Sequence, residues 1–256
     1  LNRGVGFTMS LPKITTAYYP ESDGRPMGET DEHRIAMVRN IELLSNHYRG
    51  QKVYVSGDLL LYYLQGNPKK FVVPDAFIAK GLNQRKRRIY RLWVEQVVPQ
   101  LVIETTSRKT KKKDMVEKPE LYARLGVDEY FLHDPTSDYL DPPLQGYRLK
   151  DGQYERIIAE PTGGLYSEQL DLELRITEDE LNFFRRGTSD RLLTNLEMVE
   201  FETAARQREA EARQREAEGR QREAEARQRA EAEAERLRAE LAKYKRASGN
   251  GKDSPS

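Results

Sequence analysis

The chain has 256 residues and a formal net charge of +1, because 43 lysine and arginine residues nearly balance 42 aspartate and glutamate residues. It contains no cysteine, which excludes disulfides, thiolate metal sites and cysteine nucleophiles and agrees with a reducing, cytoplasmic location. No apolar run approaches the ~18–20 residues that cross a membrane, so we expect no membrane partner.

Charge is distributed unevenly along the chain. Between residues 202 and 246, 24 of 45 residues are charged. In the rest of the chain the fraction of charged residues is close to that of an ordinary globular protein. The sequence therefore predicts a disordered N-terminal arm (1–14), a folded domain (15–190), a charged helical extension (191–247) and a disordered tail (248–256). Because a start-like sequence begins only at Met9, we expect residues 1–8 to be an upstream translation artefact.

The folded domain begins with a predicted helix at 29–48, where apolar residues recur every three or four positions and Thr30 is placed to cap the N-terminus. Strands are predicted at 53–64 and 71–78, and Pro74 places the second at a sheet edge or strand end. A further strand or hairpin arm follows at 89–97. The short apolar run Leu101-Val-Ile103 is typical of a strand buried on both faces.

The second half of the domain continues with alternating signals. Residues 109–125 have helical spacing and end at Gly126, a favourable residue just after a helix. A strand is predicted at 129–133, and Asp151-Gly152 predicts a hairpin turn between two further strands. Two more short strands are predicted at 170–176 and 181–184. This order of helices and strands predicts an α+β domain with a mixed sheet.

Two acids are placed where strands end. Asp75 follows Pro74, and Glu104 ends the apolar strand 29 residues later. If neighbouring strands bring them together, their carboxylates form a hard oxygen site suited to Mg²⁺. Such a metal can generate hydroxide and stabilise a phosphodiester transition state. The alternative, which spacing alone favours, is a turn acid and a solvated strand-end acid.

Basic residues are concentrated beside both acids. Cations in such clusters neutralise a phosphate backbone, which suits DNA as a partner; the alternative is a solvated helix face and a loop. On the predicted helix after Glu104, Lys118 could act on a metal-bound water, and Asp114 and Tyr122 recur on the same face. The candidate nucleic-acid-binding residues are Arg85, Lys86, Arg87, Arg88, Arg108, Lys109, Lys111, Lys112 and Lys113.

Four segments carry a family resemblance: VPDAFI at 73–78, LVIETTS at 101–107, DMVEK at 114–118 and LYARLGVDEYF at 121–131. Together they resemble the Uma family of restriction-endonuclease-like proteins, within the PD-(D/E)XK nuclease superfamily. The resemblance covers residues 15–185 and is far more specific than an acid pair. It implies a restriction-endonuclease-like mixed sheet flanked by helices. It also implies hydrolysis of DNA phosphodiesters with Mg²⁺, or alternatively Mn²⁺.

The resemblance implies roles for individual residues. Asp75 matches the aspartate of the PD motif and Glu104 matches the acid of the (D/E)XK motif, and both would bind metal together with the carbonyl of Thr105. The lysine of the superfamily pattern would fall at Thr106, which is a departure. In the Uma pattern the match is Lys118, which would reach the water from the following helix.

Pro119 and the first helix leave alternatives open. Either the helix begins near Pro119, which would leave residues 114–118 in a loop, or it kinks there. Superfamily members often add a glutamate from the first helix, and Glu42, Glu32 or Glu29 could serve. The sequence does not choose among these three.

The remaining polar candidates favour structural interpretations. His33 is expected on the helix surface or in packing, and His133 at a strand end is expected to be structural. Asp58 is favoured as a bulge residue over a site acid. Ser107 could cap the next helix, and no histidine is placed to activate it as a nucleophile.

The tail repeats every seven residues from Arg206, with sequences of the type RQREAEA. Six Glu-to-Arg pairs four residues apart, beginning with Glu209–Arg213, stabilise such a helix by about 1–3 kcal/mol in total. The period is also that of a coiled coil, but its seam would hold only glutamine and alanine. The sequence leaves two alternatives open for this helix. It either self-associates weakly to give a homodimer or acts as a single charged spacer.

Two functions of different classes follow from the sequence. The first is a metal-dependent DNA endonuclease in which Asp75 and Glu104 bind metal and Lys118 assists the attacking water. The second is a non-catalytic nucleic-acid-binding or scaffolding protein that retains the fold and self-associates through its C-terminal helix. The intact set of Asp75, Glu104 and Lys118 favours the enzyme.

Overall fold

The computed structural model describes residues 17–22 and 30–249. The chain forms two compact units, residues 1–195 and residues 196–256. The predicted N-terminal arm and translation artefact lie outside the described residues, as do Glu29 and residues 250–256 of the predicted tail.

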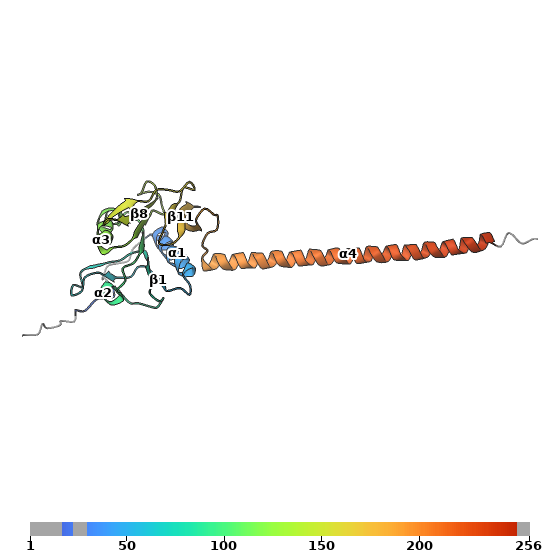
Figure 1. Cartoon of the computed structure of the whole chain (residues 1–256), viewed down its shortest axis with the longest axis horizontal. Coiled ribbons are helices and arrows are strands. Elements are labelled where there is room, and N and C mark those ends of the chain that lie inside the picture. The colour runs from blue at the N-terminus through green and yellow to red at the C-terminus, as the bar shows by residue number, and fades with distance from the viewer. Residues whose placement is uncertain (1–16, 23–29, 250–256) are drawn as a thin grey trace, which may run out of the picture. The chain divides into compact units, whose positions relative to one another are not determined.

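A six-stranded mixed sheet is the largest sheet of the first unit, part of which is labelled in Figure 1. Its strand order is β1-β4-β6-β7-β8-β9, in which β6 and β7 are parallel and all other neighbours are antiparallel. The strands are β1 (Val53–Ser56), β4 (Ala76–Lys80), β6 (Leu101–Thr105), β7 (Glu129–His133), β8 (Leu144–Lys150) and β9 (Gln153–Arg156).

Two three-stranded sheets and four short helical elements complete this unit. One sheet has the order β3-β2-β5 and the other β10-β11-β12. Their strands are β2 (Leu61–Tyr62), β3 (Phe71–Val72), β5 (Tyr90–Arg91), β10 (Leu165–Ser167), β11 (Leu172–Thr177) and β12 (Glu180–Arg185). The helical elements are α1 (Asp31–His47), α2 (Leu92–Glu95), the π-helical turn η1 (Lys113–Glu117) and α3 (Lys118–Leu125). This arrangement is the α+β domain with a mixed sheet that the sequence predicts.

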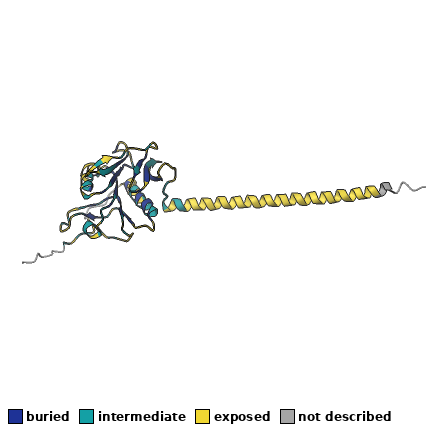
Figure 2. Cartoon of the chain, in the orientation of Figure 1, coloured by how far each residue is buried: buried dark blue, intermediate teal, exposed yellow. Residues whose placement is uncertain are grey.

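Alternating residues of the central sheet contribute to two separate hydrophobic cores. On β1 and β4, Val55 and Ile78 belong to the core that also contains Leu43 of α1 and the sheet β10-β11-β12. Their neighbours Tyr54 and Phe77 belong to the core that contains residues of α3 and of the sheet β3-β2-β5. The central sheet is therefore covered on both faces, and Figure 2 shows the resulting buried residues throughout the first unit.

Several predicted elements are confirmed and others are interrupted. The helix capped by Thr30, the apolar strand β6 and the Asp151-Gly152 hairpin between β8 and β9 are present. The predicted strand 53–64 is broken into β1 and β2, and 71–78 into β3 and β4. The predicted strand 89–97 is only the two residues of β5 followed by α2. Strand β10 was not expected.

Helix α1 buries a different set of side chains from the one its apolar spacing indicates. Ile35 and Val38 are 56% and 53% exposed, whereas His33, Asn40 and Leu43 are buried. The helix is therefore confirmed, but its N-terminal half turns a polar side chain toward the sheet.

The second unit consists of helix α4 (Asn195–Gly249) from residue 196 onward. Every described side chain from residue 201 to residue 245 is exposed, and Figure 2 shows the exposed colour along most of this helix after its partly buried start. Four of the six predicted Glu-to-Arg pairs form, with N···O distances of 2.5–3.9 Å. Arg227 instead contacts Glu231 at 3.0 Å. None of the helices within the described residues is sufficiently long and apolar to span a membrane.

Candidate active site

Asp75 and Glu104 meet at the junction of β4 and β6. The antiparallel register pairs Ala76 with Ile103, which brings the preceding Asp75 beside the following Glu104. The two are linked reciprocally, because the Asp75 amide donates to Glu104 Oε2 at 3.2 Å and the Thr105 amide donates to Asp75 Oδ2 at 2.8 Å. The alternative that Glu104 is a solvated strand-end acid is therefore wrong, because Glu104 is completely buried.

The strand breaks on the Asp75 side have a local physical cause. Pro74 has no amide hydrogen to donate to a sheet, and its carbonyl instead accepts from the Asp58 amide at 2.9 Å. Asp58 has a φ of 47°, and a Cβ on Gly57 would lie 1.9 Å from the Asp75 carbonyl oxygen. The chain can pass this close only with glycine at that position, and the break then leaves Asp75 at the start of β4.

Lys118 reaches the acids from the π-helical turn and α3. Its Nζ lies 2.8 Å from Glu104 Oε2 and 2.9 Å from Asp114 Oδ1. The Tyr122 hydroxyl, one turn further along, donates to Glu104 Oε1 at 2.8 Å. Asp114, Lys118 and Tyr122 therefore do face one side, and they converge on Glu104.

Residues 114–118 do not form a loop, because they lie in the π-helical turn η1 and at the start of α3. The Lys118 amide donates to the Lys113 carbonyl, which is a π-type bond over five residues, and Pro119 sits in the first turn of α3. A π-type bond from residue 119 would have used the Asp114 carbonyl. Tyr130 supplies that missing donor, because its hydroxyl lies 2.7 Å from this oxygen.

His33 is the site residue that the sequence interpretation missed. It is 4% exposed, and its Nε2 lies 3.3 Å from Asp75 Oδ2. The usable signal was the seven-residue spacing from His33 to Asn40, which places two polar residues on the buried face of α1. His33 therefore does not lie on the helix surface, and of the two roles expected for it only packing agrees with its burial.

Carboxyl groups outnumber lysine within this cluster. Burial raises the pKa of Glu104 well above its usual range, and the neighbouring Asp75 and Asp114 raise it further against the opposing effect of Lys118. Burial would also raise the pKa of Asp75, but His33 and Lys118 outweigh it and lower that pKa below its usual value. Burial likewise raises the pKa of Asp114. Three carboxyl groups surround one lysine, which is an environment that favours an added cation.

Of the three glutamates proposed for the first helix, Glu42 and Glu32 lie within the described residues. Glu42 Oε1 accepts from the Asn195 amide at 2.9 Å, at the start of α4 rather than at the acid cluster. Glu32 lines a pocket beside His33.

In the part of the chain that the structure describes, no group of three or more histidine, aspartate and glutamate side chains could hold a metal ion.

The predicted basic set divides into surface and structural residues. Arg87 is not a surface cation, because its side chain is 5% exposed, paired with Glu95 at 2.9 Å and stacked on the Tyr54 ring. Arg85 shares Glu95, and Arg88 contacts Glu21. The exposed basic residues are Arg85, Lys86, Arg88, Arg108, Lys109, Lys111, Lys112 and Lys113.

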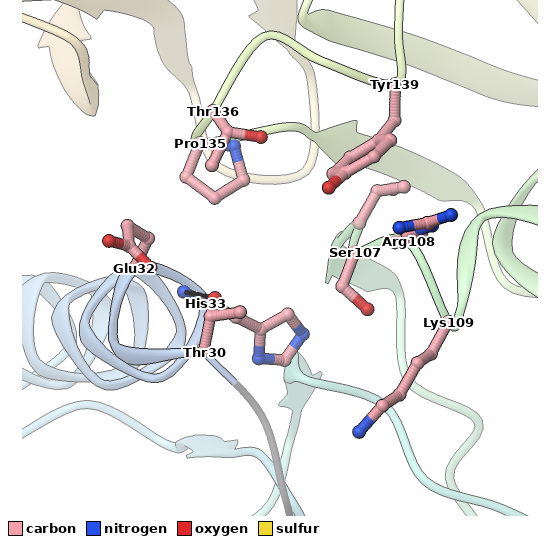
Figure 3. Close-up of a pocket in the computed structure, with 10 residues that line it drawn as sticks. Thr30, Glu32, His33, Ser107, Arg108, Lys109, Pro135, Thr136 and Tyr139 are labelled. Carbon is pink, nitrogen blue, oxygen red and sulfur yellow. Dashed lines mark hydrogen bonds between the residues drawn. The ribbon is translucent and has the colours of Figure 1, made fainter.

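A pocket of about 350 Å³ opens beside the acid cluster (Figure 3). Its walls are the first turn of α1, residues 106–109 after β6, and the loop after β7. His33 connects the two features, because it contacts Asp75 and also lines the pocket. Thr106, at the position of the superfamily lysine, is 1% exposed and lines the same pocket.

Together these features define an α+β domain with a buried acid–lysine cluster that opens onto a polar pocket. The model of the Uma2 family, described as "Putative restriction endonuclease", matches residues 18–179. The match spans more than half of the chain, so the protein belongs to the Uma2 family. The expected family resemblance is therefore confirmed.

A solved structure described as "a putative nuclease belonging to DUF820 from Anabaena variabilis ATCC 29413" is similar at 14% sequence identity and a TM-score of 0.39, over 54% of this chain and 75% of that chain. A search of curated proteins finds no match.

Proposed function

We propose that the protein is a divalent-metal-dependent DNA endonuclease that hydrolyses phosphodiester bonds at the acid–lysine cluster. The observation that carries this proposal is the convergence of Asp75, Glu104 and Lys118 from β4, β6 and the η1–α3 segment. Membership of a family described as restriction endonucleases supports the same class of reaction.

The donor set of the cluster fits Mg²⁺ or Mn²⁺. The carboxylates of Asp75 and Glu104 and the carbonyl of Thr105 are hard oxygen donors, and Mg²⁺ in proteins is commonly held by one or two carboxylates, with waters and substrate phosphate completing its coordination. The excess of carboxyl groups over lysine also favours a cation at this position. When bound, such a metal would lower the pKa of water and neutralise charge on the scissile phosphate.

The other residues would orient these groups. Lys118 is held between Glu104 and Asp114, so its ammonium can donate a hydrogen bond to the attacking water or to a phosphate oxygen. His33 holds one oxygen of Asp75, and Tyr122 holds one oxygen of Glu104. The exposed residues Lys109–Lys113 would contact the DNA backbone.

A nicking assay on supercoiled plasmid with Mg²⁺ or Mn²⁺ tests this function. We expect cleavage by the intact chain, and loss of at least 100-fold in Asp75→Asn and Glu104→Gln, since each removes a metal ligand. Glu120→Gln, on the exposed face of α3, is the matched control and should cleave normally. Cleavage that persists unchanged in both acid variants would overturn the mechanism.

The rival function makes a different prediction in the same assay. A non-catalytic binding protein would retain DNA in a mobility-shift experiment without metal and would show no cleavage with either metal. The departure at Thr106 is the feature that favours this rival. Cleavage that depends on Asp75 and Glu104 excludes it.

A further inference from the structure

The pocket beside the acid cluster lies where several elements direct polar groups to one point. The strands β6 and β7 are parallel, and the segments that follow their carboxyl ends form two of its walls. Ligands of α/β sheets commonly bind outside the carboxyl ends of parallel strands. The third wall is the N-terminus of α1, where Thr30 caps the His33 amide at 3.3 Å and the helix dipole is positive.

The pocket has a cationic side suited to phosphate. Arg108 and Lys109 line it on the wall that follows β6. Arg108 is exposed and makes no ion pair with any residue that the structure describes. Glu32 is a carboxylate on the α1 wall, and Figure 3 shows it across the pocket from Arg108 and Lys109. A phosphate is therefore favoured near Arg108, and an amino-bearing group near Glu32.

Tyr139 offers a stacking surface opposite His33. It lies in the loop after β7, and Figure 3 shows Tyr139 and Pro135 on one side of the pocket with His33 and Thr30 on the other. Buried Asp134 organises this loop by accepting from the amides of Tyr139 at 2.5 Å and Leu140 at 2.9 Å. Aromatic side chains held in this way commonly stack on unpaired bases.

We propose that this pocket binds one unstacked nucleotide of the substrate, with its phosphate beside Arg108 and its base against Tyr139. The inference rests on the proposed nuclease function and adds a substrate requirement to it. A volume of about 350 Å³ is at the lower end for small-molecule pockets and is too small for a base pair. The bound nucleotide must therefore come from single-stranded or locally opened DNA.

Calorimetric titration of the full-length chain with dCMP, in the presence of EDTA, tests the pocket without requiring cleavage. We expect dCMP to bind at least tenfold more tightly than deoxycytidine or inorganic phosphate, because neither fragment fills both ends of the pocket. Equal affinity for dCMP and inorganic phosphate, or no binding of dCMP at millimolar concentration, would overturn the proposal.

Two substitutions separate binding from folding. Arg108→Ala and Tyr139→Ala should each weaken dCMP binding at least fivefold without lowering the thermal unfolding temperature. Arg156→Ala and Tyr244→Ala, both at exposed positions outside the pocket, are the controls and should bind dCMP normally.

The outcomes distinguish this proposal from the proposed function. Binding of dCMP that depends on Arg108 and Tyr139, in a chain that cleaves no DNA, would support the pocket and reject the nuclease. Metal-dependent cleavage with dCMP binding unaffected by either substitution would support the nuclease and reject the pocket. If both proposals hold, single-stranded DNA should be cleaved faster than duplex of the same sequence.

Discussion

The Nζ of Lys118 lies 2.8 Å from Glu104 Oε2, although the two residues belong to different elements and are 14 positions apart in the chain. The superfamily pattern places the lysine two residues after the acid, on the same strand. Here the π-helical turn η1 brings Asp114 and Lys118 to one side, where Asp114 contacts the lysine at 2.9 Å. The charge of Lys118 therefore reaches Glu104 from a helical segment and not from the strand that carries the acid.

The first prediction concerns Lys118. Lys118→Met should reduce the cleavage rate by ~10²–10⁴-fold, the usual contribution of a positioned acid–base group. A second substitution, Thr106→Lys, restores the superfamily position and should recover at least tenfold of the lost rate. The measurement is single-turnover cleavage of plasmid DNA, and an unchanged rate in Lys118→Met would remove this residue from the mechanism.

The second prediction concerns His33. Its Nε2 holds Asp75 Oδ2 at 3.3 Å, and the removal of such a supporting group typically weakens metal binding by ~10–100-fold. We therefore expect His33→Ala to raise the Kd for Mn²⁺, measured by electron paramagnetic resonance, within that range. His47→Ala, at the other end of α1, is the control. Equal Kd values in the two variants would show that His33 does not position Asp75.

The third prediction concerns the Tyr122 hydroxyl, which donates to the buried Glu104 at 2.8 Å. Tyr122→Phe leaves a buried carboxyl oxygen without this donor, so the free energy of unfolding should fall by ~1–3 kcal/mol. Tyr154→Phe is a matched control, because its hydroxyl donates to the Val127 carbonyl at the same distance. Urea unfolding of both variants should show the larger loss for Tyr122→Phe.

The fourth prediction concerns the pH dependence of stability. Burial lowers the pKa of His133 from 6.5 to about 4, and the nearby charge of Asp134 only partly opposes this shift. The unfolded chain therefore takes up a proton at His133 before the folded chain does. The contribution of His133 to the free energy of unfolding is therefore complete above pH 6.5. It declines as the pH falls toward 4, by roughly 3 kcal/mol in total.

Denaturant unfolding across this pH interval checks the fourth prediction. The difference in unfolding free energy between the native sequence and His133→Gln should change by most of that amount between pH 7 and pH 4, since glutamine does not titrate. A difference that stays constant with pH would contradict the assigned shift.

The fifth prediction concerns helix α4. In each seven-residue repeat the seam consists of a glutamine and an alanine, such as Gln207 and Ala210. The positions on one side of this seam are arginines, such as Arg213, and those on the other side are glutamates, such as Glu218. In a parallel in-register pair, these flanking positions oppose each other with opposite charge, whereas an antiparallel pair would oppose arginine to arginine. We therefore expect self-association, where it occurs, to be weak and parallel.

The absence of cysteine from the sequence makes this orientation easy to test. Ala210→Cys, on the seam, should form an intermolecular disulfide under mild oxidation, and Ala212→Cys, on the outer face, should not. Sedimentation of the intact chain and of a chain ending at residue 195 measures the association itself. Equal monomer masses for both chains would identify α4 as a single spacer helix.

Local signals in the sequence were sufficient wherever a short stretch determines its own structure. Thr30 as a cap, the Asp151-Gly152 turn and the apolar strand β6 follow from backbone preferences and burial over a few residues. The convergence of Asp75 with Glu104 was expected from the family resemblance but not from spacing alone, because only the pairing of β4 with β6 in the fold makes the two strands neighbours.

Only the tertiary structure decided which polar residues become buried together. His33 and Arg87 carry charge or polarity in the sequence, yet His33 lies against Asp75, and Arg87 packs between Glu95 and Tyr54. The η1 turn likewise depends on a distant donor, the Tyr130 hydroxyl, which satisfies the carbonyl that Pro119 leaves without a partner. Local patterns cannot predict such contacts, because the cost of burying a polar group is offset by partners from other elements, and only the fold brings those partners within reach.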